Sequence, residues 1–188
     1  MSSDEISEIL AGIREGRSDA VRDLLPIVYA ELHAMAHYKL GGGQRVLLNT
    51  TELVHETFLK LFGHAPLDVH DRRHFYSVAA IAMRHILVDK ARRQKAAIHG
   101  GGAVHVDVDE MDVAVDGQPE MILALNDALS RLILKDEVLA KIVELHFFTG
   151  LTFEEVAGVM DMSVSTVKRR WREARALLRR ELARDEDS

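Results

Sequence analysis

The chain has 188 residues, an apolar content of 47% and a formal net charge of -6, and this length suits one large domain or two small ones. The absence of cysteine excludes a disulfide framework and a thiolate metal site. No apolar run reaches the roughly 18 residues that a membrane span needs, and the polar, acidic start MSSDEISEIL differs from a signal peptide. We therefore expect a soluble cytoplasmic protein.

The composition predicts an all-α protein, because prolines number only three and the helix-forming residues Ala, Leu, Arg and Glu are abundant. Apolar periodicity predicts helices over about residues 4–15, 19–40, 51–62 and 71–95. The core candidates of the last two helices are Leu53, Val54, Thr57, Phe58, Leu61 and Phe62, then Phe75, Val78, Ala79, Ala82, Ile86 and Leu87.

The end of the fourth predicted helix is strongly basic. Five cations stand there against Asp89 alone, which gives a local net charge of +4; they are Arg84, Lys90, Arg92, Arg93 and Lys95. A cationic helix face of this kind is suited to phosphate groups of nucleic acid.

The composition changes over residues 100–119. Gly100 opens a segment that carries five acidic residues and has no helical period. This pattern favours a flexible acidic linker, although the alternation over residues 104–108 leaves a short strand as the alternative. Beyond Pro119, periodicity predicts helices near 119–131 and 135–148, with Gly150 ending the second. We therefore expect two small helical domains, 1–96 and 118–188, joined by the linker 97–117.

Residues 151–182 read as two helices joined by a tight turn. Thr152 is placed to cap the first helix, and Glu155, three residues on, completes a capping box. Asp161 and Met162 make the turn, and Ser163 is placed to cap the second helix.

The second of these helices, over about 164–184, has a cationic face. It carries eight basic residues against Glu173 and Glu181, a local net charge of +6. Its apolar residues are spaced three or four positions apart and form one face, the apolar seam of this helix: Val164, Val167, Trp171, Ala174 and Leu178. A basic amphipathic helix is also found as a solvated surface helix or at a membrane or calmodulin. The capped helix just before it favours a DNA-binding helix-turn-helix.

Three motifs in this order resemble the extracytoplasmic-function (ECF) class of bacterial RNA polymerase sigma factors, over almost the whole chain. The first is Glu52-Leu53-Val54-His55-Glu56-Thr57-Phe58-Leu59-Lys60-Leu61-Phe62, and the second is Arg84-His85-Ile86-Leu87-Val88-Asp89. The third is Leu151-Thr152-Phe153-Glu154-Glu155-Val156-Ala157 followed by Ser163-Val164-Ser165-Thr166-Val167-Lys168. The resemblance implies a sigma-2-like domain followed by a sigma-4-like helix-turn-helix domain.

The resemblance implies contacts with promoter DNA. The -35 element would be read at the start of the last helix by Ser165, Thr166, Lys168, Arg169 and Arg172. The -10 element would be engaged from the first domain by Arg84, His85, Lys90, Arg92 and Arg93. His85 stands in place of the family's usual Asn, so specificity at the -10 element is expected to differ.

The resemblance also implies core RNA polymerase as partner, docked on Glu52, Leu53, His55, Glu56 and Phe58. ECF sigma factors usually carry Asp-Ala-Glu-Asp just before this helix's Leu-Val, where this chain has Asn49-Thr50-Thr51-Glu52. One interpretation is that a threonine simply caps the helix. The other is that a Ser/Thr protein kinase restores the missing charge by phosphorylating Thr51, or failing that Thr50. The sequence says nothing about an anti-sigma factor.

The patterns that could indicate a metal site or a catalytic site are weak. His33 and His37 stand one helical turn apart, but the metal-binding order His-Glu-x-x-His is absent, so we predict no metal site and no cofactor. No catalytic arrangement can be argued, and we predict that the protein is not an enzyme. The alternative function is a stand-alone helix-turn-helix regulator with an N-terminal sensor or dimerisation domain. The basic end of the first domain favours the sigma factor, because a sensor domain has no need of it.

Overall fold

The computed structural model describes residues 8–9, 11–12, 26–27, 29–30, 32–33, 50–62, 71–97 and 119–186, and within these ranges it contains helices and turns but no strand. The prediction of an all-α protein is thereby confirmed. The helices predicted over 4–15 and 19–40 are described only at those few positions, all of them helical. The predicted linker lies almost entirely outside the described residues, and the domain boundaries stay a prediction.

The helices are α3 (Thr50–Phe62), α4 (Arg72–Ala97), α5 (Pro119–Lys135), α6 (Glu137–Val143), a π-helical turn η2 (Glu144–Phe148), α7 (Phe153–Met160) and α8 (Val164–Glu186). The first two agree with the predicted helices to within two residues. Asp71 begins α4, since its Oδ1 accepts a hydrogen bond from the His74 N–H at 2.7 Å. This is an N-cap, which satisfies a backbone donor that the helix leaves unpaired.

The break between α5 and α6 lies later than the predicted one. α5 continues to Lys135 because Leu132 is buried and prolongs its apolar face. Asp136 then caps α6 by accepting a hydrogen bond from the Leu139 N–H at 3.0 Å. The π turn η2 follows and has Thr149 as its C-cap. Gly150, just beyond the cap, has a φ of 71°, a left-handed conformation that glycine adopts without strain.

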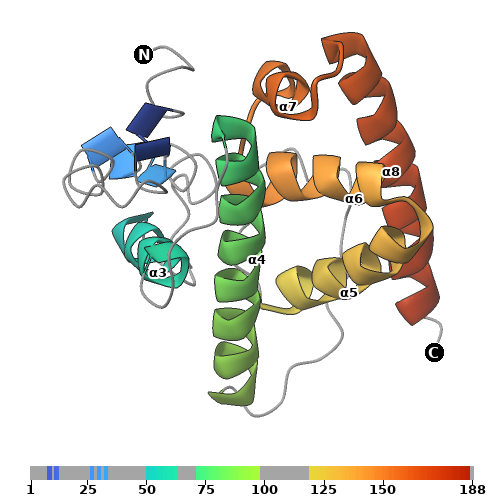
Figure 1. The fold of residues 1–188 in the computed structure, drawn as a ribbon. Helices are drawn as coiled ribbons and strands as arrows, with labels where there is room; N and C mark the ends of the chain where they lie inside the picture. The colour runs from blue at the N-terminus through green and yellow to red at the C-terminus, as the bar shows by residue number, and fades with distance from the viewer. Residues whose placement is uncertain are drawn as a thin grey trace.

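α4 is the central helix of the described structure. Figure 1 shows it upright, with α3 on one side and α5 and α6 on the other. Ile86, Leu87 and Val88 are all buried, and three successive residues cover about 200° of a helix surface. Helices therefore enclose α4 on more than one side, and the buried side chains of α3 to α8 form one hydrophobic cluster.

α8 is the outermost helix and packs on α5, α6 and α7. Its buried residues include the predicted seam from Val167 to Leu178. Near its C-terminal end, Glu181 joins it to α5 through Arg131, at 2.9 Å, and Lys135, at 2.5 Å. The apolar seam and this ion-paired end fix both the position and the rotation of α8.

Candidate nucleic-acid interface

The predicted caps of the helix-turn-helix are present. Thr152 Oγ1 accepts a hydrogen bond from the Glu155 N–H at 3.2 Å, and the Thr152 N–H donates to Glu155 Oε2 at 2.8 Å. Asp161 ends α7 in the left-handed region, with a φ of 55°. Ser163 Oγ then accepts from the Thr166 N–H at 3.2 Å and begins α8. The turn is therefore defined locally, by the backbone conformation of Asp161 at one end and by the Ser163 side chain at the other.

Trp171 is the centre of the seam that holds α8. It is buried, and its ring lies 4.7 Å from the His146 ring and 6.1 Å from the Phe153 ring, measured between centroids. His146 also stacks on Phe153 at 4.4 Å and contacts the Leu151 carbonyl through Nδ1 at 2.6 Å. Because η2, α7 and α8 meet at this aromatic group, the outward face of α8 is set by the packing beneath it.

The outward face at the start of α8 carries the predicted base-reading residues. Four of them are exposed and Thr166 is half-buried; the exposed ones are Ser165, Lys168, Arg169 and Arg172. Lys168 Nζ lies 3.5 Å from Glu154, but both side chains are largely exposed, and such surface pairs contribute little. Ser165 Oγ also lies 3.0 Å from Ser163 Oγ, and Arg172 Nε donates to the Lys168 carbonyl at 3.4 Å. The described partners of these side chains are therefore local and lie at the protein surface.

Arg170, on the same helix, has partners within the protein. Its Nη1 lies 3.6 Å from Asp136, the cap of α6, and 3.3 Å from Glu173. The contact with Arg170 gives Glu173 a role in the protein's own structure. Arg170 therefore links α8 to the start of α6.

Two of the predicted -10 residues on α4 are also engaged inside the protein. Arg84 Nη1 lies 3.1 Å from Glu144 Oε1 of η2, and each of these side chains is only 11% exposed. Lys90 Nζ lies 2.8 Å from Glu52 and 2.9 Å from Glu56, both on α3. The hydrogen bonds to Glu52 and then Glu56 raise the pKa of the Lys90 ammonium. The remaining three, His85, Arg92 and Arg93, are exposed.

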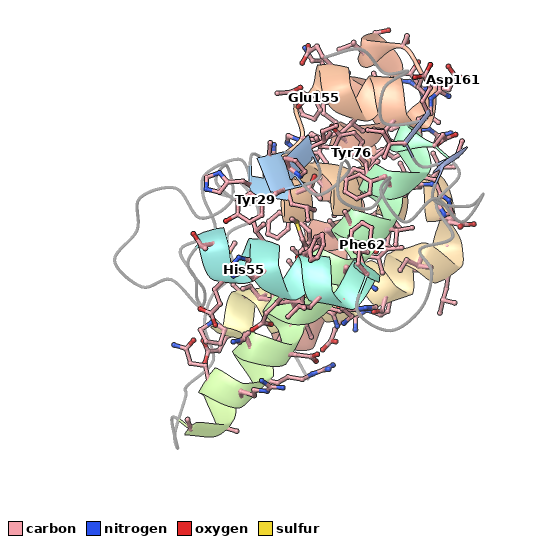
Figure 2. The ribbon with its side chains drawn as sticks, turned by 60° about the vertical axis from the view of Figure 1, so that its left-hand side comes forward. Tyr29, His55, Phe62, Tyr76, Glu155 and Asp161 are labelled. Carbon is pink, nitrogen blue, oxygen red and sulfur yellow. The ribbon has the colours of Figure 1, made fainter. Side chains whose placement is uncertain are left out.

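The predicted polymerase-binding residues on α3 differ in exposure. Leu53 is fully buried, whereas His55 is exposed and lies beside Tyr29, with ring centroids 5.9 Å apart (Figure 2). Phe58 is half-buried and stacks on Phe62 at 4.7 Å. Thr51, the predicted phosphorylation site, is exposed in the first turn of α3, and Thr50 is the first residue of that helix.

The family model of the ECF sigma factor matches residues 3–184, nearly the whole chain. The chain belongs to the ECF sigma factor family. This ECF sigma factor therefore directs transcription initiation, with core RNA polymerase and promoter DNA as partners. The family is not an enzyme class. No curated protein and no solved structure matches the chain.

The surroundings of His85 in this ECF sigma factor favour the neutral form of its imidazole. Burial lowers the pKa of its imidazole below 6.5, and the nearby cations Lys60, Arg84 and Arg92 lower it further against the opposing effect of Asp89. A neutral imidazole keeps one ring nitrogen as donor and the other as acceptor. At the place of the family's Asn, this side chain offers hydrogen bonds and a flat face rather than a positive charge.

Sequence reasoning did not single out Glu144, the partner of Arg84. The available signal was a lone carboxylate in the apolar run Ile142–Phe148. Burial raises the pKa of the Glu144 carboxyl, against smaller opposing effects of Arg84 and Lys141.

The described ranges hold neither a candidate metal site nor a candidate membrane span. Within them, no group of three or more possible ligands could hold a metal ion. No helix in the same ranges is long and apolar enough to cross a membrane.

Proposed function

We propose that this ECF sigma factor, acting in the cytoplasm, reads the -35 element with the start of α8 and engages the -10 element with α4. The observation that carries the proposal is the outward face of α8. Ser165, Lys168, Arg169 and Arg172 are exposed within its first turns, while a buried seam fixes the opposite side. In helix-turn-helix proteins, base contacts come from the N-terminal part of the second helix.

The test compares Arg169→Ala and Arg172→Ala with Arg180→Ala, which removes one exposed cation further along the same helix. The first two variants should lower run-off transcription from a promoter that depends on its -35 element, since a lost base contact costs about 1–3 kcal/mol. Arg180→Ala should lower run-off transcription less, and by the same factor at every promoter, because a phosphate contact carries no sequence information. Polymerase pull-down should be unchanged throughout. Wild-type transcription by both test variants would place the base-reading face elsewhere.

The proposed -10 contacts fall into two groups. His85, Arg92 and Arg93 are exposed, and Arg92 pairs with the exposed Asp89 at 3.6 Å, so all three can contact DNA with little rearrangement. The flat His85 ring suits stacking on an unpaired base. Arg84 and Lys90 would first have to leave Glu144 and the α3 carboxylates. We therefore assign the first promoter encounter to the exposed three.

For polymerase we propose docking on α3 through Glu52, His55, Glu56 and Phe58, with Leu53 supporting the helix from below. Leu59 supports this proposal, because it is 61% exposed on the same helix. An exposed leucine among polar neighbours adds apolar area to a docking face.

We further propose that a Ser/Thr protein kinase strengthens this docking by phosphorylating Thr51, with Thr50 as the second choice. The exposure of Thr51 in the first turn of α3 supports the proposal. A phosphothreonine carries about -1.5 to -2 charges and is stabilised at a helix N-terminus. Polymerase pull-down with wild type, Thr51→Ala and Thr51→Glu, each with and without kinase, tests it. Full binding by the unphosphorylated protein or by Thr51→Ala would leave Thr51 as a helix cap only.

A further inference from the structure

The Lys168 side chain, at the start of α8, lies against the start of α7. Its Nζ is 5.8 Å from the centroid of the Phe153 ring and 3.5 Å from a carboxylate oxygen of Glu154. A cation within about 6 Å of an aromatic face is attracted by the ring, whereas the exposed pair with Glu154 contributes little. The position of the Phe153 ring therefore affects where the Lys168 ammonium lies.

His146, in the π turn η2, holds the Phe153 ring. Its imidazole stacks on that ring, with centroids 4.4 Å apart and an angle of 21° between the planes. The imidazole is itself oriented, because its Nδ1 lies 2.6 Å from the Leu151 carbonyl. A carbonyl oxygen only accepts hydrogen bonds, so Nδ1 is the donor. The backbone closes the same turn, since the His146 carbonyl accepts a hydrogen bond from the Gly150 N–H at 3.1 Å.

The same imidazole also contacts α8. Its ring meets the buried Trp171 ring at a centroid distance of 4.7 Å and an angle of 78°, and this edge-to-face arrangement is a preferred geometry of aromatic pairs. Trp171 comes three residues after Lys168, about one helical turn along α8. His146 therefore locates Lys168 twice, at its backbone through Trp171 and at its ammonium through Phe153.

Neither contact alone requires a histidine at this position. A phenylalanine could stack on Phe153 and pack against the indole, and a glutamine could donate to the Leu151 carbonyl, but the imidazole does both. An apolar ring could slide and rotate against Phe153. The hydrogen bond to Leu151 leaves the imidazole one orientation, and so it defines the position of the ring stacked on it.

We propose that His146 is a positioning residue for recognition of the -35 element. It needs no contact with DNA, because it sets through Phe153 and Trp171 the place from which Lys168 meets a base edge. This inference rests on the proposed reading of the -35 element by α8. A misplaced Lys168 still attracts phosphates, since that attraction depends on charge, but it loses the geometry that distinguishes one base pair from another. Loss of His146 should therefore reduce discrimination between promoters more than overall affinity.

The experiment measures run-off transcription by the full chain with core RNA polymerase, from a cognate promoter and from promoters with single base-pair changes in the -35 element. Lys168→Ala should lose about 5- to 150-fold of discrimination at one base pair. His146→Phe keeps an aromatic ring and removes the hydrogen bond. It should lose about threefold or more at the same base pair, because hydrogen bonds weaken steeply away from their preferred geometry. His146→Gln keeps a donor and removes the stacked ring; it should act in the same direction and serves if His146→Phe fails to fold.

Two further measurements separate positioning from a purely structural role. Ile122→Val, at a buried position of α5, weakens the core away from the aromatic group and should leave discrimination at the wild-type level. In the Lys168→Ala background, His146→Phe should cause no further loss of discrimination, since the residue through which it acts is already gone.

The outcomes separate this inference from the proposed function. If the His146 variants lower transcription from every promoter by one factor, or lose discrimination in full addition to Lys168→Ala, the positioning role is refuted while the reading face stands. Unchanged discrimination in Lys168→Ala alone would also overturn positioning through Lys168. Unchanged discrimination in Arg169→Ala and Arg172→Ala as well would overturn the proposed reading of the -35 element by α8.

Discussion

Replacing Lys90 with Met tests whether this lysine joins two helices or is available to DNA. Its Nζ lies 2.8 Å from Glu52 and 2.9 Å from Glu56, so one ammonium on α4 holds two carboxylates of α3. Methionine keeps most of the aliphatic length and removes the charge. The variant should therefore lose the bridge without creating a large cavity.

The expected loss follows from the exposure of the three side chains. Lys90 is 23% exposed, Glu52 43% and Glu56 37%, so solvent screens both pairs in part. Pairs of this kind contribute about 0.2–1 kcal/mol each. Lys90→Met should then lower the free energy of unfolding by roughly 0.5–2 kcal/mol, and Glu52→Gln or Glu56→Gln by less, since the other carboxylate remains.

Urea unfolding followed by far-ultraviolet circular dichroism measures these differences. A double-mutant cycle between Lys90→Met and Glu52→Gln isolates the pair itself. Lys95→Met, at an exposed position of the same helix, is the matched control. The opposite outcome is that Lys90→Met is as stable as Lys95→Met and weakens promoter binding more than that control does. In that case the ion pairs with α3 would contribute nothing to stability, and the role of Lys90 would be the DNA contact predicted from the sequence.

Three further predictions concern stability. Thr152→Ala should cost about 1 kcal/mol of unfolding free energy through loss of the N-cap, and Thr152→Ser should restore it. Met83→Ala, at a fully buried position of α4, should cost about 2–5 kcal/mol in the same urea assay. Burial raises the pKa of the Glu144 carboxyl in the folded protein above its value in the unfolded chain. The contribution of Glu144 to the free energy of unfolding is therefore complete at pH values below its pKa in the unfolded chain, and it is lost as the pH rises through its pKa in the folded protein. Glu144→Gln should flatten this decline in a pH series of urea unfolding curves. A decline as steep as that of wild type would assign it to the other ionisable groups that line the same surface pocket between α4 and the helices α5, α6 and η2, namely His74, Arg84, His85, Glu137 and Lys141.

The elements that the sequence predicted well depend on chemistry within a few residues. The capping box of Thr152 and Glu155, the turn at Asp161 and the cap at Ser163 each involve neighbours no more than three positions apart. The α3 and α8 helices show clear three- and four-residue apolar steps, so their buried faces could be assigned. Tyr76, which lies beside the predicted core residue Phe75 on α4, is also buried in the core.

The sequence could not supply contacts between distant segments. Lys90 and Glu52 are 38 positions apart, and the Arg84 contact with Glu144 spans more. A basic residue on an amphipathic helix looks the same in sequence whether it meets solvent, DNA or a buried carboxylate. The π turn was also missed, because a widened helical turn has no distinct residue pattern. Arg84 and Lys90 were therefore grouped with the exposed cations of α4.

The enclosure of α4 also has a consequence for folding cooperativity. Its apolar side chains belong to one cluster with residues of α3 and of α5 to α8, so neither group of helices can lose its structure without exposing part of this helix. Two independent domains joined by a flexible linker would unfold in separate thermal transitions, each with its own melting temperature and enthalpy of unfolding. Helices that share a central member melt together, and a destabilising change in the middle of α4 lowers the melting temperature of both groups at once.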